Sequence, residues 1–310
     1  MKLCCLLGLF SVAVWAIEVP NGTFEKGQGE QPDGWQLVDG SGGWRSRLGG
    51  HVFVRGDGND MGYWRSSSLP FEPGKLYRVS FRARSADAGG GTAVTGPVFC
   101  NMDIGVPPTE WRRYRGVFLA PHNLSAESSW LRFGQWHASG EIAFDDVVVE
   151  EVQAIHARQD ALVLGDGEDV SGGSYTFRAP LNSDGRNSSR PLALAACNFN
   201  SNRWTFGANS EVIYAHQVGD HTQVSGEVEV TVGYYSGGQL IVEASADGKP
   251  WQAIGLLGEK GTVTQALPEG FFPAKEIRIR LRAETKQKVG AAQSDPGSFQ
   301  VHGFRYQATL

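Results

Sequence analysis

The sequence has very little cysteine beyond its first residues. Of its 4 cysteines, Cys4 and Cys5 lie in an apolar leader, which leaves Cys100 and Cys197 for the rest of the chain. A disulfide-rich scaffold needs several spaced pairs, so this class is excluded. A bridge between Cys100 and Cys197 stays open, but they fall in different predicted domains, and two buried thiols are the favoured interpretation.

An excess of positive charge is also lacking. The chain has 28 Lys and Arg against 33 Asp and Glu, which gives a net charge of −5. A general nucleic-acid binder needs a basic surface to neutralise phosphates. We therefore expect no nucleic-acid partner, and a neutral or weakly charged ligand fits better.

Long apolar runs are equally scarce. One run, residues 3–15, follows Lys2 and ends at the small residues Val14 and Ala16. This pattern predicts a cleavable signal peptide at residues 1–16, too short for a transmembrane helix. No second run could span a membrane, so we expect a protein without a transmembrane segment that is secreted, periplasmic or displayed on the cell surface.

Catalytic motifs are missing as well. The sequence contains no serine elbow, no His-Glu-x-x-His, no phosphate loop and no Cys–His arrangement. A glycosidase needs only two suitably separated carboxylates, which leave no such pattern. We expect no catalytic residues and no enzymatic activity, with the glycosidase alternative left open.

What the sequence does contain is short alternating strands and glycine-rich turns. Residues 77–84 place Tyr77, Val79, Phe81 and Ala83 on one face and polar side chains on the other, and residues 227–232, 240–244 and 276–282 repeat this period. Turn signals such as residues 72–74 and 89–91 separate such runs. The pattern predicts an all-β protein; the best helix candidate, residues 155–162, is short.

The organisation predicted from this pattern is two β-sandwich domains in tandem after the signal peptide. The valine-rich segment 147–152 closes the first unit, which gives domains at residues 17–152 and 153–310. The second unit ends at a strand over residues 304–308. These two units leave no segment for a catalytic domain.

Residues 17–152 resemble the carbohydrate-binding modules of families 4, 9 and 22. The motifs that carry the resemblance are residues 21–27, 32–35, 73–84, 111–121 and 140–147. It implies a jelly-roll sandwich of the galactose-binding-like class and a polysaccharide or glycan as partner. In the second unit, residues 238–251 are similar to the strand–turn–Trp element of discoidin-like sandwiches, which suggests the same class there.

The resemblance also implies a structural calcium ion (Ca²⁺) in the first domain. Its carboxylate ligands would be Glu25 and Asp146 or Asp145, because calcium takes about 6–8 oxygen ligands and these acids match the family positions. Neighbouring residues on a strand face opposite ways, so the choice between the two aspartates stays open. The alternative is that these acids cap turns or pair with nearby Arg.

Aromatic side chains are the expected contacts for sugar rings, whose apolar faces stack on aromatic planes. The resemblance assigns Trp35 and Trp111 to packing. If Leu131 and Phe133 face inward, Trp130 and Arg132 share the outward face, and Trp136 follows a few residues later. The preferred ligand cluster is Trp136 with Trp64 and Arg132. The candidate ligand residues are Trp136, Trp64, Arg132, Trp130, Trp44 and Tyr63. The alternative is that these rings fill the ends of the sandwich.

Arg78, Arg82 and Arg84 form a further row, which could line a groove for acidic or sulfated sugars or could be an ordinary solvated sheet face. His216 and His221 are expected at the surface.

The sequence therefore predicts an exported, non-catalytic carbohydrate-binding protein with a structural calcium site. Its rivals are a structural or adhesive envelope protein that uses both sandwiches for protein contacts and a polysaccharide-degrading enzyme. The oligomeric state is not predicted.

Overall fold

The computed structural model describes residues 16–46, 49–159, 161–181, 186–287, 294–295 and 297–310. Nearly every element in these ranges is a strand, beside the short 3-10 helices η1 (Ala126–Ser128) and η2 (Glu269–Phe271). The predicted all-β class is confirmed. The predicted signal peptide falls almost entirely outside the described residues.

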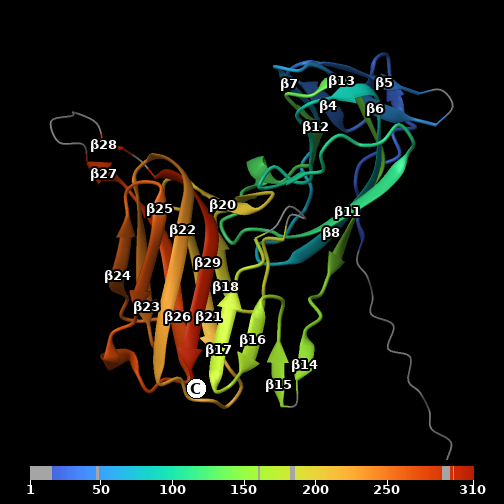
Figure 1. The fold of residues 1–310 in the computed structure, drawn as a ribbon. Coiled ribbons are helices and arrows are strands. Elements are labelled where there is room, and N and C mark those ends of the chain that lie inside the picture. Colours follow the sequence, from blue (N-terminus) through green and yellow to red (C-terminus); the bar gives the residue numbers. More distant parts are fainter. Residues whose placement is uncertain (1–15, 47–48, 160, 182–185, 288–293, 296) are drawn as a thin grey trace, which may run out of the picture.

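The first sandwich is a jelly roll that lies in the upper right of Figure 1. Its 6-stranded sheet has the order β11 (Arg112–Leu119), β8 (Leu76–Gly89), β13 (Ser139–Val152), β6 (His51–Asp57), β5 (Ser41–Arg45), with β1 (Ala16–Ile17) paired to β13. The opposing strands belong to a 12-stranded sheet and are, in spatial order, β10 (Cys100–Asp103), β9 (Thr92–Thr95), β12 (Arg132–Trp136), β7 (Met61–Ser66) and β4 (Trp35–Val38).

The second sandwich contains a 5-stranded sheet with the order β18 (Leu192–Ala196), β21 (Glu211–Gln217), β26 (Glu276–Glu284), β23 (Gln239–Ser245), β24 (Gln252–Leu257). Opposite it lie the remaining strands of the 12-stranded sheet: β19 (Asn198–Asn200), β20 (Arg203–Phe206), β29 (Ser298–Thr309), β17 (Ser174–Arg178), β16 (Glu168–Ser171), β22 (Ser225–Gly237) and β25 (Gly261–Ala266).

Three small hairpins complete the described elements: β2 (Gly27–Gln28) with β3 (Gln31–Pro32), β14 (Ala157–Gln159) with β15 (Leu162–Leu164), and β27 (Lys286–Gln287) with β28 (Ser294–Asp295). The second of these lies where residues 155–162 offered the best helix candidate, so the chain forms a hairpin there instead.

The alternating runs form strands as predicted. In β8 the side chains of Tyr77, Val79, Phe81 and Ala83 are buried, whereas those between them are partly exposed. β26 alternates in the same way, with Ile277, Ile279 and Leu281 buried. Burial of these apolar rows in the space between the sheets is what selects the strand register, because a slip of one residue would turn each row to solvent.

The 12-stranded sheet joins the two sandwiches through one parallel pair, β10 with β19. The backbone N–H of Phe199 donates to the carbonyl of Phe99 at 2.8 Å, and the N–H of Ser201 donates to the carbonyl of Asn101 at 2.8 Å. We call this junction the seam. The predicted division at residues 152 and 153 stays a prediction, and the described sheet continues across it.

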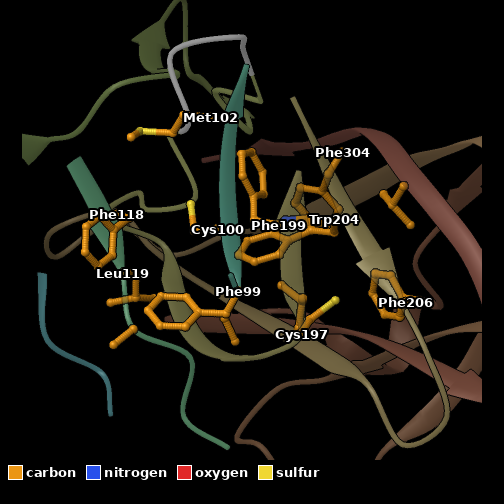
Figure 2. Packing of buried hydrophobic residues seen from close by; sticks show 14 of the residues in the cluster. Phe99, Cys100, Met102, Phe118, Leu119, Cys197, Phe199, Trp204, Phe206 and Phe304 are labelled. Atoms are coloured by element: carbon orange, nitrogen blue, oxygen red, sulfur yellow. The ribbon is translucent and has the colours of Figure 1, made fainter. Parts of the chain in front are cut away.

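An apolar core lies beneath the seam and belongs to both halves of the chain. Figure 2 shows Phe99, Phe118 and Leu119 from the first half close to Phe199 and Trp204 from the second. The rings of Phe99 and Phe118 are 5.7 Å apart, and those of Phe199 and Trp204 are 5.1 Å apart. The hydrophobic core is therefore continuous between the sandwiches.

Cys100 and Cys197 also lie in this core (Figure 2). Burial raises the pKa of both thiols, because the thiolate would lose its hydration. The interpretation as two buried thiols is confirmed.

Asn187 ties the linker before β18 to the end of β11. Its amide accepts from the N–H of Leu119 at 2.7 Å and donates to the carbonyl of Leu119 at 2.9 Å, and both residues are buried. The Asn187 side chain thus makes the two hydrogen bonds to Leu119 that a neighbouring strand would otherwise make. Buried backbone groups need such partners, since an unsatisfied one loses its water without compensation.

We predict that Asn187→Ala destabilises the whole chain. The substitution leaves the N–H and carbonyl of Leu119 without their partner, which should cost about 1–3 kcal/mol for each buried group. Thermal and urea denaturation measure the loss. Asn123→Ala, at an exposed position, is the control and should change stability by no more than about 0.5 kcal/mol. Equal stabilities of the two variants would contradict the proposed role of Asn187.

Candidate functional site

The face of β7 and β12 that points away from the sandwich core carries most of the candidate ligand residues. Phe133 is buried, and the two strands pair so that Trp136 lies opposite Met61 and Gly134 opposite Tyr63. Trp64 is buried on the other side of β7. We call the outward surface of β7, β12 and β9 the outer face.

Trp136 is the most exposed aromatic side chain on the outer face, with 51% of its surface accessible. Its ring stacks on His137 at a centroid distance of 4.1 Å and an interplanar angle of 15°. His137 has a left-handed backbone with φ of 53°, which places the two rings one above the other. Met61, 48% exposed, and Thr92 are its cross-strand neighbours. Together these side chains make an apolar platform at the end of the strands.

Tyr63 continues this surface along β7. Its ring is parallel to that of Trp130, with centroids 6.0 Å apart, and the guanidinium of Arg65 lies 4.4 Å from the centre of Trp130. The indole N–H of Trp130 donates to the carbonyl of Glu127 at 2.9 Å. Because Trp130 is held on several sides and is buried, it supports Tyr63 more than it offers a ligand surface of its own.

Between Trp136 and Arg132 the outer face carries no side chain, because the residue there is a glycine. Gly134 is the intervening outward position of β12, and a Cβ there would lie 2.4 Å from the Cβ of Tyr63. Any side chain at this position would collide with β7 and push Tyr63 away. The absence of one leaves a shallow surface between the Trp136 platform and Tyr63.

Arg132 extends from the outer face to the seam. Its Nη2 donates to Oδ1 of Asn101 at 2.8 Å, and the amide of Asn101 donates to Asp103 and Asn200 at 2.8 and 2.9 Å. Ser201 Oγ donates to Asp103 Oδ2 at 2.5 Å. Burial lowers the pKa of Arg132. The predicted ligand residue therefore binds mainly to a polar network that joins the two sandwiches.

Trp64 and Trp44 lie away from the outer face. The indole N–H of Trp64 donates to the carbonyl of Phe53 at 2.9 Å, and that of Trp44 to the carbonyl of Phe24 at 2.7 Å. Both line a pocket of about 610 Å³, whose other walls are Glu30, Gln31, Gln36, Leu37, Gly42, Gly43, Arg45 and Phe53. The expectation of one exposed cluster of Trp64 with Trp136 is corrected, because Trp64 is 2% exposed and faces the core.

The two segments that carry the residues predicted to hold calcium meet through their backbones next to these acids. Val147 N–H donates to the carbonyl of Gly22 at 2.8 Å, and a Cβ on Gly22 would lie 2.2 Å from the carbonyl oxygen of Val147. Glu25 accepts from the N–H of Gly50 at 2.9 Å. Backbone contact, which requires glycine at position 22, therefore joins these two segments directly.

Asp145 and Asp146 both contact a guanidinium. Arg82 Nη2 lies 2.7 Å from Asp145 Oδ2, and Arg82 Nε lies 2.8 Å from Asp146 Oδ2. A β-bulge and the positive φ of 52° at Asp146 turn both carboxylates to one side. Burial raises the pKa of Asp145, against which Arg82 acts in the opposite direction. This arrangement fits the alternative in which the acids pair with Arg.

The same arrangement does not fit a calcium ion on these aspartates. The bound guanidinium already supplies the positive charge, and a second cation beside it would be repelled. No group of three or more His, Cys, Asp or Glu side chains suited to a metal is found among the described residues. The calcium site implied by the resemblance stays a prediction for experiment.

Because Arg82 engages both aspartates, we expect the melting temperature of the protein to be the same in calcium and in chelator. A ligand at a hundred times its dissociation constant would add about 2.7 kcal/mol to the native state. Differential scanning calorimetry in calcium chloride and in EDTA, with magnesium chloride as the ionic control, makes the comparison. A rise that is specific to calcium would restore the metal site.

The second sandwich contains a buried ionisable cluster that the sequence did not indicate. His216 is fully buried, contrary to the surface position expected for it, and its ring stacks on Tyr306 at 4.1 Å. The Tyr175 hydroxyl lies 3.3 Å from His216 Nδ1 and donates to Glu168 Oε1 at 2.7 Å. Arg190 Nε donates to Glu168 Oε2 at 2.6 Å. Within the described part of the chain, His216 Nε2 has no hydrogen-bond partner.

Burial lowers the pKa of His216 well below its usual value, and Arg190 acts in the same direction. The unfolded chain takes up a proton at this histidine below about pH 6.5, whereas the folded chain does not. We therefore predict that stability is lost as the pH falls below about 6.5, by up to about 1.4 kcal/mol per pH unit. Denaturation from pH 7.5 to 5 measures the slope.

His216→Phe should flatten this slope, because the ring keeps its stacking partner and loses its basic nitrogen. The control His221→Gln, at an exposed position, should leave the slope as it is. A slope that persists unchanged in His216→Phe would assign the acid sensitivity to other groups.

The comparisons with known proteins concern the fold. No protein-family model matches the chain, and no curated protein matches it. Among solved structures, the tandem CBM22-1–CBM22-2 domain of Paenibacillus barcinonensis Xyn10C is 11% identical and covers 95% of this chain and 98% of its own, with a TM-score of 0.34.

A structure described as CBM4 is 15% identical over 44% of this chain and 100% of its own, with a TM-score of 0.32. The N-terminal cellulose-binding domain of Cellulomonas fimi β-1,4-glucanase C is 15% identical over 44% of this chain and 99% of its own, with a TM-score of 0.30. These solved structures, carbohydrate-binding modules of families 22 and 4, are what the chain is similar to, at TM-scores of 0.34 and 0.32.

Proposed function

We propose that this protein is an exported, non-catalytic module that binds a polysaccharide on the outer face of β7 and β12. The observation that carries the proposal is the Trp136 platform, an indole that is half exposed and held in place by His137 and Met61. Neighbouring exposed apolar side chains, here Trp136 and Met61, are typical of an interaction surface. Flat aromatic surfaces are what the apolar faces of sugar rings require.

The shallow surface beside Trp136 supports a chain-shaped ligand. Gly134 leaves room next to Tyr63, so a second sugar could lie along β12 after the first has stacked on Trp136. Arg65 is exposed next to the Tyr63–Trp130 stack and can donate hydrogen bonds to sugar hydroxyls. The affinity should be modest, because each aromatic contact adds only about 0.5–1.5 kcal/mol.

The environment of the buried acids supports binding without catalysis. Asp145, Glu168 and Glu243 each contact an arginine, Glu243 through Arg280 at 2.6 Å. A glycosidase uses one carboxyl group as a general acid with a raised pKa and another as a base or nucleophile near the same bond. Arg280 and Arg282 outweigh the burial of Glu243 and lower its pKa, which works against a general acid at that position.

Export follows from the signal peptide predicted at residues 1–16. Within the described residues no helix is both long enough and apolar enough to cross a membrane. The structural calcium ion that the resemblance implies is opposed by the pairing of Arg82 with Asp145 and Asp146, and the calorimetric comparison above decides between the two.

Replacement of Trp136 by alanine should weaken polysaccharide binding about tenfold, because stacking contributes up to about 1.5 kcal/mol, while the melting temperature stays nearly the same. A glycan array identifies the polysaccharide, and affinity electrophoresis measures the loss. Tyr234→Ala removes an equally exposed ring, 50% accessible, from β22 in the second sandwich and is the matched control. Equal binding by Trp136→Ala and the wild type would overturn the site.

Trp64→Ala and Trp35→Ala should behave in the opposite way. Both rings are buried to 2% exposure, so truncation should cost about 3–5 kcal/mol of stability. Thermal denaturation of both variants beside Trp136→Ala checks this division between packing and ligand contact. Stable folding of Trp64→Ala together with loss of glycan binding would instead place the ligand at the pocket of Trp44 and Trp64.

A further inference from the structure

The opposite surface of the first sandwich carries a concentration of arginines. In β8, Arg82 and Arg84 alternate with buried Phe81 and Ala83 and therefore point outward. In β11, the ring of Tyr114 stacks on Phe81 at 5.7 Å and points inward, so its neighbours Arg113 and Arg115 point outward. We call the surface made by Arg82, Arg84, Arg113, Arg115 and Trp111 the arginine face.

Trp111 organises these guanidinium groups. The guanidinium groups of Arg84 and Arg82 lie 4.9 and 5.4 Å from the centre of its ring, and the His51 ring is nearly perpendicular to it, with centroids 5.5 Å apart. The resemblance assigned Trp111 to packing, but the ring lies on the outside of the sheet and is only partly buried. A guanidinium stacked on an indole has lost part of its conformational freedom before any ligand arrives.

Positive charge on this face exceeds its local compensation. Arg113 lies directly opposite Arg82 across the strand pair, and like charges in such pairs destabilise a sheet. Asp145 and Asp146 engage Arg82, which leaves Arg113 at 3.8 Å from Asp146. The ion pairs found among the described residues include neither Arg84 nor Arg115. The arginine face is therefore locally positive, although the net charge of the chain is −5.

We propose that the arginine face binds an anionic polysaccharide, whose sulfate or carboxylate groups are received by Arg84, Arg113 and Arg115. Planar guanidinium groups form paired hydrogen bonds with both kinds of anion. Outward side chains on adjacent strands are about 5 Å apart and those along one strand about 7 Å apart, so the arginines form a grid that can meet repeated charges on a polymer. This site lies on the sheet opposite the outer face and does not depend on the Trp136 platform.

A structural explanation exists for part of this pattern. β11 is the edge strand of its sheet, and charged side chains on an edge discourage pairing with another molecule. That explanation accounts for Arg113 and Arg115, but not for Arg84, which is on the neighbouring strand and is placed by Trp111. An experiment with polymers of different charge distinguishes edge protection from polysaccharide binding.

The test measures binding of the full-length protein to fluorescently labelled dextran sulfate, polygalacturonate and neutral dextran at low and at physiological salt. We expect binding to one or both anionic polymers, none to neutral dextran, and weaker binding at higher salt because the contacts are exposed. The two anionic polymers distinguish sulfate from carboxylate recognition. Binding to neither, or only to vesicles that contain anionic lipid, would overturn the proposal.

Variants locate the contact. Arg113→Gln with Arg115→Gln should lower the affinity for the bound polymer about tenfold, the effect of losing about two exposed charged contacts, and Arg84→Gln should lower it further. The control combines Arg158→Gln with Arg186→Gln, at exposed positions in the second half, and removes the same charge. An equal fall in this control would show general attraction and contradict the site. Glycan binding through Trp136 is measured separately, so either proposal can fail alone.

Discussion

The parallel pairing of β10 with β19 is the interaction on which the arrangement of this molecule depends. It places Phe99 and Phe199 on one apolar core and brings the polar groups of Asn101 and Asn200 to one surface. Each unmade backbone hydrogen bond at this buried place would cost more than the bond itself contributes, so the seam is specific. The sheet of the first sandwich therefore continues into the second, and Arg132 reaches the junction from the outer face.

The strands with one buried and one open face could be predicted from the sequence, whereas the seam could not. β8 alternates because only one of its faces is covered. In β10, Cys100, Asn101 and Met102 are all buried, since the strand is covered by the core on one side and by a polar network on the other. A strand of this kind carries no period, and its partner is about a hundred residues away in the sequence. Long-range pairing leaves no local pattern for the sequence to show.

The candidate site illustrates the same limit at the level of single residues. The alternation that turns Leu131 and Phe133 inward was sufficient to predict that Arg132 faces outward. It was not sufficient in β7, because Tyr63 and Trp64 are both aromatic and either could fill the core. Trp64 does so, and its indole N–H reaches the carbonyl of Phe53. The side chain that remains outside, Tyr63, is the one that can belong to the outer face.

The contacts of Arg82 could not be predicted from the sequence resemblance, although they determine the surroundings of Asp145 and Asp146. The acids at positions 145 and 146 match a metal-binding pattern, and on a regular strand they would face opposite ways. The bulge brings both carboxylates to one guanidinium, that of Arg82. The first and last segments are then joined by the Gly22–Val147 backbone contact. Because Asp145 and Asp146 pair mainly with Arg82, the neighbouring Arg84 has no ion pair among the described residues, and its guanidinium stays available on the arginine face.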